Sequence, residues 1–177
     1  MRATALNCTL KPSPASSSTD ELLDLVAKEL SSFDIELDRH RVVDHSVSFG
    51  VSSDEGGDDG WPTLRAAVLA SDIFVLATPI WMGHPSSVAQ QVLERLDAFL
   101  GEQDDQGRII SSGRVAVVAV VGNEDGAHLV GSQLFQGLND VGFTIPAQGM
   151  TYWVGEAMHT VDFKDLEHIP RVVSQAT

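Results

Sequence analysis

Cysteine, basic side chains and long apolar runs are all scarce in this 177-residue chain. Its one cysteine, Cys8, excludes an intrachain disulfide framework, a cysteine-bound zinc site and an iron–sulfur cluster held by this chain alone. The 11 lysines and arginines are scattered among 25 acidic residues, and the formal net charge is −14. Nucleic acids and anionic membrane surfaces would be repelled, so we expect neither as a partner.

Targeting segments and several catalytic motifs are also absent. No apolar run approaches the roughly 18 residues of a membrane helix, and the N-terminal MRATALNCTL is too short and polar for a signal peptide, so we expect a cytoplasmic protein. The chain has no GxSxG, no GxxxxGK[ST], and no GxGxxG after its first strand. This disfavours a hydrolase, a P-loop enzyme and a dinucleotide-binding Rossmann site.

What the chain does contain is an alternation of strand-like and helix-like segments. The pattern predicts strands at 2–8, 35–43, 72–79, 114–122 and 143–149, and helices at 18–32, 62–68, 86–100 and 127–141. Residues 46–60 are rich in Gly, Ser and Asp and predict a mobile, solvated loop. A hydrophobic content of 43% suffices for one core, so we expect a single domain over 1–177.

Strands that alternate with helices predict a parallel sheet with helices on both faces. The apolar segment 114–122 belongs in the middle of the sheet, whereas half-exposed 35–43 belongs at an edge. Pro146 places the last strand, 143–149, at an edge or a strand end. We therefore predict a doubly wound α/β fold with five strands in the order 2-1-3-4-5. Residues 165–177 barely begin a fifth helix, which we expect to be short or truncated.

In such a sheet a ligand lies beyond the carboxyl ends of the strands, here at loops 9–18, 79–86 and 122–127. The first loop leads into a helix with hydroxyl residues at 16–19, and Lys11 adds a positive charge. A helix start with free N–H groups and hydroxyls can hold a phosphate. The alternative is that Ser18 and Glu21 form only a capping box after an extended linker.

The other two loops have two interpretations each. Trp81 and Met82 favour a site for a planar ring, or else form a hydrophobic lid or a subunit contact. The glycines of GNEDGAH allow backbone N–H groups to approach a ligand, or else the segment is a tight turn with Asp125 as the N-cap of the next helix. Glu124, Asp125 and His128 lack a further ligand placed by the sequence, so we expect no metal site.

Three segments, SSSTDELL, ATPIWMGHPSSVAQQVLERLDAF and VVGNEDGAH, resemble the flavodoxin-like NAD(P)H-dependent FMN reductase and quinone reductase family over nearly the whole chain. The resemblance implies that the first loop surrounds the phosphate of FMN and that the other two border its isoalloxazine ring. The residues so implied are Thr9, Lys11, Ser17, Ser18, Thr19, Pro79, Ile80, Trp81, Met82, Gly83, Gly122, Asn123, Glu124, Asp125 and Gly126. The family's first loop often has Gly-Ser and an arginine, where this chain has Cys8-Thr9-Leu10-Lys11.

The resemblance also implies an activity. FMN would take hydride from NAD(P)H as co-substrate and pass it to a small-molecule acceptor such as a quinone or free flavin, so no catalytic side chain is required. Family members commonly form homodimers or homotetramers with the flavin near the interface. Tyr152 and Trp153 of a late loop would then contribute near the flavin, or else they pack in the core. Two alternatives stay open: a flavodoxin-type electron carrier whose acidic surface docks basic partners, and a flavin-free scaffold that binds proteins.

Overall fold

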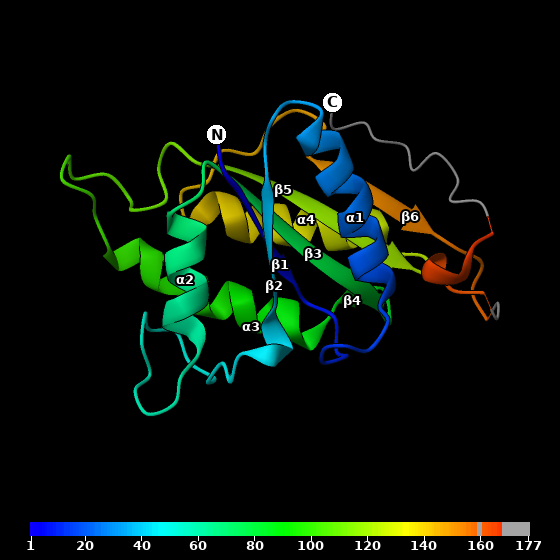
Figure 1. Ribbon diagram of the computed structural model, residues 1–177. Helices are drawn as coiled ribbons and strands as arrows, with labels where there is room; N and C mark the ends of the chain where they lie inside the picture. The colour runs from blue at the N-terminus through cyan, green and yellow to red at the C-terminus, as the bar shows by residue number, and fades with distance from the viewer. Residues whose placement is uncertain (159–160, 168–177) are drawn as a thin grey trace.

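Strands and helices alternate along the chain as the periodicity predicts (Figure 1). The computed structural model describes residues 1–158 and 161–167. Its strands are β1 (Ala3–Asn7), β2 (Leu37–Arg41), β3 (Ile73–Trp81), β4 (His84–Pro85), β5 (Val115–Gly122) and β6 (Met150–Val154). Its α-helices are α1 (Ser18–Ser31), α2 (Trp61–Leu69), α3 (Ser87–Leu96) and α4 (Ala127–Asp140), and its 3-10 helices are η1 (Val42–Asp44), η2 (Asp97–Gly101) and η3 (Phe163–Asp165).

The sheet has the predicted doubly wound order. Its parallel strands run β2-β1-β3-β5-β6, which is the order 2-1-3-4-5 when only parallel strands are numbered. The short β4 is an addition that pairs antiparallel with the end of β3. In the register, Asn7 at the end of β1 lies beside Arg41 of β2 and Ala77 of β3. The carboxyl ends of the central strands therefore meet at one edge, the expected position of a ligand site.

The position predicted for the last strand was wrong. Segment 143–149 contributes only an isolated bridge between Thr144 and Val115, and then turns, with the Gly149 N–H bonded to the Pro146 carbonyl at 3.2 Å. The parallel strand forms afterwards, at β6, because Pro146 lacks the N–H that a ladder requires. Tyr152 and Trp153 consequently lie on a strand and not in a late loop. The expected fifth helix falls mostly on 168–177, outside the described residues.

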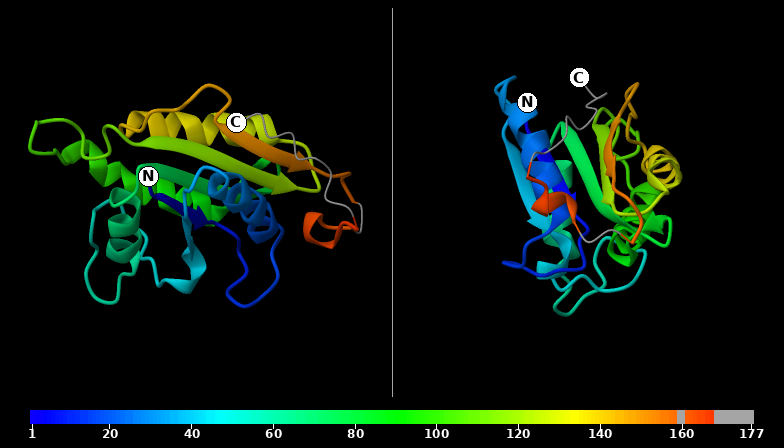
Figure 2. Two further views of the ribbon diagram at one scale, coloured as in Figure 1. Left: turned by 45° about the horizontal axis from the view of Figure 1, so that its top comes forward. Right: turned by 90° about the vertical axis from the view of Figure 1, so that its right-hand side faces the viewer.

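Helices cover both faces of the sheet (Figure 2). One core cluster joins the sheet to α2, α3 and α4, while a second joins the other face to α1 and η3. The predicted apolar stripes of α3 and α4 are buried, from Val88 to Phe99 and from Ala127 to Val141. Gly142 follows α4 with φ +97°, so it ends the helix as predicted.

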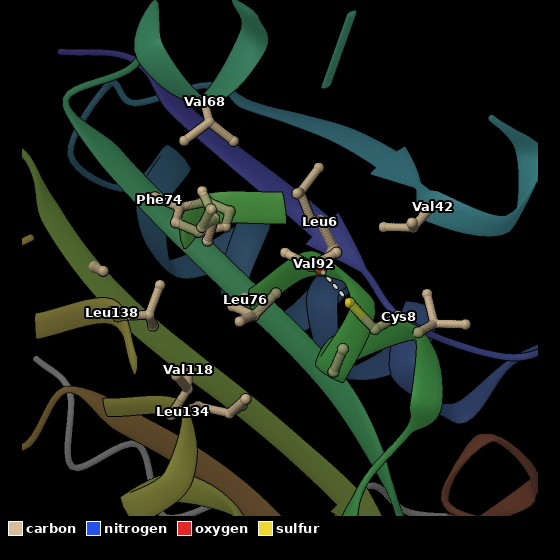
Figure 3. Close-up of a cluster of buried hydrophobic side chains, with 14 of the residues drawn as sticks. Leu6, Cys8, Val42, Val68, Phe74, Leu76, Val92, Val118, Leu134 and Leu138 are labelled. Atoms are coloured by element: carbon tan, nitrogen blue, oxygen red, sulfur yellow. Dashed lines mark hydrogen bonds between the residues drawn. The ribbon is translucent and has the colours of Figure 1, made fainter. Parts of the chain in front are cut away.

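Side chains of the central strands fill the larger core (Figure 3). Leu6, Leu76 and Val118 come from three neighbouring strands and pack against helix residues such as Val92. Cys8 is fully buried among them and its thiol points to the Leu6 carbonyl, 3.9 Å away. Burial raises the pKa of this thiol, so Cys8 acts as a small apolar core residue and not as a nucleophile.

The acidic loop 46–60 is not simply solvated, contrary to its composition. The Asp59 side chain is only 1% exposed and accepts N–H bonds from Ser48, Glu55 and Trp61 at 3.0 to 3.1 Å. Arg95 of α3, whose side chain is fully buried, donates to it at 2.7 Å. Burial alone would raise the pKa of Asp59, but these N–H groups and the guanidinium together lower it to about 2.

Candidate functional site

The carboxyl edge of the sheet carries a cleft of about 460 Å³, a size typical of ligand sites. All three loops chosen from the sequence contribute to it. It is lined by Thr9, Leu10, Lys11, Ser17, Ser18, Thr19, Pro79, Ile80, Trp81, Val121, Gly122, Asn123, Glu124, Trp153, Ala157, Met158, Asp162 and Phe163. Most of the residues predicted to bind a cofactor therefore lie around one space.

Helix α1 begins one residue earlier than expected if Ser18 and Glu21 formed a capping box. Ser17 is the N-cap, with extended backbone, and its hydroxyl accepts the N–H of Thr19 at 3.2 Å. Ser18 is already helical, so the alternative with Ser18 as N-cap was wrong. Because Ser17 and not Ser18 caps the helix, the Ser18 and Thr19 side chains are left on the first turn, where both line the cleft.

The hydroxyls at this end of the cleft are prepared to donate. The Thr9 hydroxyl accepts the N–H of Lys11 at 3.3 Å, and that of Ser17 accepts the N–H of Thr19. A hydroxyl whose oxygen already accepts a backbone N–H keeps its proton for an acceptor ligand. Together with the positive end of the α1 dipole and the Lys11 side chain, this donor set suits an anion such as a phosphate.

Asp20 and Glu21 are both in the first turn of α1, but neither lines the cleft. Asp20, in its first turn, is absent from the cleft lining and pairs with Arg41 and with the Asn7 amide instead. The carboxylates that do line the cleft are Glu124 and Asp162. Both accept hydrogen bonds from the rim: Glu124 from the second loop and Asp162 from the Asn123 amide at 2.9 Å.

The second loop is a hairpin rather than an irregular loop. β3 continues to Trp81, which pairs with His84 across a two-residue turn of Met82 and Gly83, with φ +54° and +76°. Two central residues with positive φ make a type I′ turn, whose twist suits antiparallel strands. Trp81 lines the cleft while remaining 53% exposed. Its ring therefore offers an open apolar face at the mouth.

The third loop packs directly on this hairpin. Gly126 has φ +129°, and a Cβ there would lie 2.8 Å from the Gly83 Cα, so only glycine permits the approach. The Glu124 carboxylate then accepts the N–H groups of Met82 and Gly83 at 3.0 and 3.2 Å. The N-cap of α4 is Gly126 and not Asp125, which accepts the Gly126 N–H at 2.7 Å.

Four predicted site residues are thus not in the cleft lining: Met82, Gly83, Asp125 and Gly126. Met82 and Gly83 form the turn that Glu124 ties to the third loop, and Gly126 lies against Gly83. The Asp125 side chain accepts the N–H of Gly126 at the start of α4. These contacts fix the two loops relative to each other and leave Pro79, Ile80 and Trp81 to face the cleft.

Sequence reasoning missed the contribution of the late residues. Phe163 of η3 is buried, lies 5.2 Å from the Trp153 ring between centroids, and lines the cleft with Ala157, Met158 and Asp162. In Figure 1, η3 lies near the start of α1, and the Lys164 N–H faces the Ser18 hydroxyl at 3.5 Å. No periodic pattern marks such a short segment, although its aromatic Phe163 among acidic residues was a usable signal.

The cleft lining therefore combines hydroxyl donors and a helix start with aromatic and apolar side chains. A molecule that carries both a phosphate and a flat ring matches this combination. The residues present thus fit FMN, and they do so by the chemistry of the donor set and by Trp81, Trp153 and Phe163 around the apolar part.

Comparisons with known proteins agree with this geometry. Residues 1–159 match the family described as NADPH-dependent FMN reductase. A solved structure of RosB with the bound intermediate 8-demethyl-8-formylriboflavin-5'-phosphate superimposes with a TM-score of 0.83 at 31% identity, covering 92% of this chain and 68% of that one. An archaeal flavodoxin shares the fold alone, with a TM-score of 0.59 at 7% identity over 88% of this chain and 85% of that one.

Two curated relatives are longer than this chain. The 8-demethyl-8-aminoriboflavin-5'-phosphate synthase of Streptomyces davaonensis is 31% identical over 89% of this chain and 65% of its own length. A Mycobacterium bovis protein named divalent metal cation transporter MntH is 38% identical over 89% of this chain, which spans 24% of that protein. Within residues 1–158 and 161–167, no helix has the length and apolar character that a bilayer crossing requires.

The family match covers most of the chain. The fold supports it, and so do the relatives that are 31% identical in sequence. The chain therefore belongs to the NADPH-dependent FMN reductase family, a family of flavin-dependent oxidoreductases with a flavodoxin-like fold.

Proposed function

We propose that the cleft binds FMN and that the chain uses it to move hydride from NAD(P)H to a small acceptor such as a quinone or free flavin. The phosphate would lie at the start of α1, and the ring between 79–81 and 122–124. The observation that carries the proposal is the donor set of the first loop, in which the Thr9 and Ser17 oxygens are taken by backbone N–H groups and their protons remain to donate.

Each part of the chain has a limited task in this scheme. The hydroxyls, the helix start and Lys11 bind the phosphate, and the Glu124 bonds to the hairpin hold the ring-side loops together. Bound FMN supplies the hydride acceptor and donor, so no general base or nucleophile is required. Trp81, half exposed at the mouth, leaves one side open for a nicotinamide and then an acceptor.

We also propose that the chain acts as a homodimer or homotetramer. Trp81 at the cleft mouth and its neighbour Met82 are 53% and 87% exposed, so two large apolar side chains lie next to each other at the surface. Interfaces are enriched in tryptophan and methionine. Light scattering of the purified protein with and without FMN tests this, and a monomer under both conditions would contradict it.

An absorbance titration with FMN tests the cofactor. We expect a saturable spectral shift at one FMN per chain, followed by steady oxidation of NADH or NADPH with a quinone. A protein that binds FMN but turns over slowly would instead be a flavodoxin-type carrier, which the net charge of −14 would suit. A preparation that stays colourless with excess FMN would favour the flavin-free scaffold and refute the proposal.

A second candidate takes the flavin as substrate. RosB, 31% identical, holds a riboflavin 5'-phosphate derivative altered at position 8. We infer that a cleft of the same fold suits this role too. Mass spectrometry of the flavin recovered after turnover separates the two: an unchanged FMN mass supports the redox cofactor, and a new mass that grows with time supports the modified substrate.

A further inference from the structure

Arg41, the last residue of β2, binds the first loop through its backbone carbonyls. Its side chain is 11% exposed, and it is absent from the cleft lining. One guanidinium nitrogen donates to the Lys11 carbonyl at 3.0 Å and to the Ala15 carbonyl at 2.8 Å. The second terminal nitrogen, Nη2, pairs with the Asp20 carboxylate. One arginine thus ties both halves of loop 9–17 to the first turn of α1.

The network continues to the cleft wall. The second oxygen of Asp20 accepts the Asn7 amide, and the Asn7 side-chain oxygen accepts the N–H of Thr9 at 2.9 Å. Asn7 is the register partner of Arg41 and is buried. A continuous chain of hydrogen bonds therefore runs from Arg41 through Asp20 and Asn7 to Thr9. It fixes the segment that carries the Thr9 and Lys11 donors.

The same arginine changes the electrostatics of the helix start. A carboxylate in the first turn of a helix competes with a bound anion for the dipole and repels it. Asp20 and Glu21 are both in that turn, and in a chain of net charge −14 such repulsion is hard to offset. The Arg41 guanidinium neutralises Asp20, and it also draws two loop carbonyls, which a phosphate would find repulsive, toward itself.

We propose that Arg41 is a positioning residue for phosphate recognition: it shapes loop 9–17 and neutralises Asp20, and so gives the cleft its preference for FMN over riboflavin without touching either. This inference rests on the proposed function. Lysine cannot replace it, because three acceptors in different directions require the planar fork of a guanidinium and not a single ammonium.

The test compares Arg41→Lys with Arg39→Lys. Arg39 is on the same strand, but its partner is Asp24, its side chain is 41% exposed, and no bond links it to the first loop among the described residues. Affinities for FMN and riboflavin are measured by quenching of flavin fluorescence, with a thermal melt of each variant. We expect R41K to weaken FMN about tenfold and riboflavin less than about twofold, and R39K to leave the ratio unchanged.

Equal losses of FMN and riboflavin in R41K, or an unchanged ratio, would overturn the inference, because a purely structural arginine gives no phosphate dependence. The double variant R41K/D20N removes the carboxylate that lysine leaves poorly paired. We expect it to recover about threefold in FMN affinity over R41K, and no recovery would refute the neutralising role.

If R41K does not fold, R41K/D20N carries the same test. The inference then requires that this double variant prefer FMN to riboflavin less strongly, by the ratio of the two affinities, than the wild type does. Failure of the proposed function looks different, because there the wild type itself binds no FMN or does not prefer FMN to riboflavin.

Discussion

Two irregular segments of this protein are each held by one arginine, and the contrast between them separates fold from function. Arg41 ties loop 9–17 to α1, and Arg95 ties loop 46–60 to α3. Both are among the least exposed charged side chains and both pair with an aspartate. Only loop 9–17 contributes to the cleft lining.

The partners of the two arginines differ in kind. Arg95 meets the Asp59 carboxylate, which is buried and accepts three further N–H bonds, and its guanidinium lies 5.8 Å over the Trp61 ring. Arg41 donates two hydrogen bonds to carbonyls of the loop beside the cleft, those of Lys11 and Ala15. Removing an arginine from a buried ion pair destabilises the fold, because its partner is left as an uncompensated buried charge. An arginine that orients the carbonyls of a ligand loop also sets what the loop can bind.

Arg95→Ala should give the largest effect on stability. It leaves Asp59 buried without its cation, which costs about 3–5 kcal/mol in unfolding free energy. Urea denaturation measures this, with Arg39→Ala as the control, since that exposed pair contributes about 0–1 kcal/mol. FMN and riboflavin affinities measured where R95A is folded should keep the wild-type ratio. A changed ratio would show that loop 46–60 also serves the cleft.

Acid should weaken the Arg95 region only at low pH. The pKa of Asp59 falls from its ordinary value of 3.8 to about 2 in the folded protein, so its contribution is complete above pH 3.8 and is lost as the pH falls through about 2. We expect the stability difference between wild type and Asp59→Asn to be constant near neutrality and to shrink across that window. A constant difference down to pH 2 would contradict the assigned pKa.

Trp81→Ala probes the ring end of the cleft instead of the phosphate end. Losing an aromatic face weakens binding of FMN and riboflavin alike, about tenfold for each. The same fluorescence titration measures both ligands, and Phe49→Ala, an exposed aromatic on loop 46–60, is the control. A loss confined to FMN would mean that Trp81 acts on the phosphate and that the two ends are wrongly assigned.

Asp44→Ala should give the smallest change. Asp44 accepts the Ser13 N–H at 2.8 Å and the Ser13 hydroxyl at 2.5 Å, and these bonds lower the pKa of its carboxyl. Without these bonds the exposed segment around Ser13 is no longer attached to Asp44, while Arg41 still binds the loop at Lys11 and Ala15. We expect about threefold weaker FMN and unchanged riboflavin. An effect larger than that of R41K would make Asp44, and not Arg41, the main support of the loop.

The sequence predicted the layers of the fold because helical periodicity and apolar strands are local signals. The stripes of α3 and α4 and the central place of β5 all follow from spacing alone. The last strand was placed seven residues too early, at 143–149 rather than 150–154. Both segments are apolar enough for a strand, and only the turn at Pro146 to Gly149 decides between them.

The site was predicted as far as chain order allows. Parallel topology brings the three loops to one edge, so Thr9, Ser18 and Pro79 meet as expected. Arg41 and Phe163 were missed because their roles depend on strand register and on how a short late segment folds back. Likewise, nothing local tells that Gly126 serves a contact with Gly83 and not a ligand.

The most direct test of the account is the affinity of Ser18→Ala/Thr19→Ala for FMN and for riboflavin, with Ser16→Ala, an exposed neighbour outside the cleft lining, as the control. Two hydrogen bonds to a charged phosphate are removed, so we expect FMN to weaken about a hundredfold while riboflavin changes less than about twofold. Equal losses for the two flavins would show that the start of α1 does not hold the phosphate.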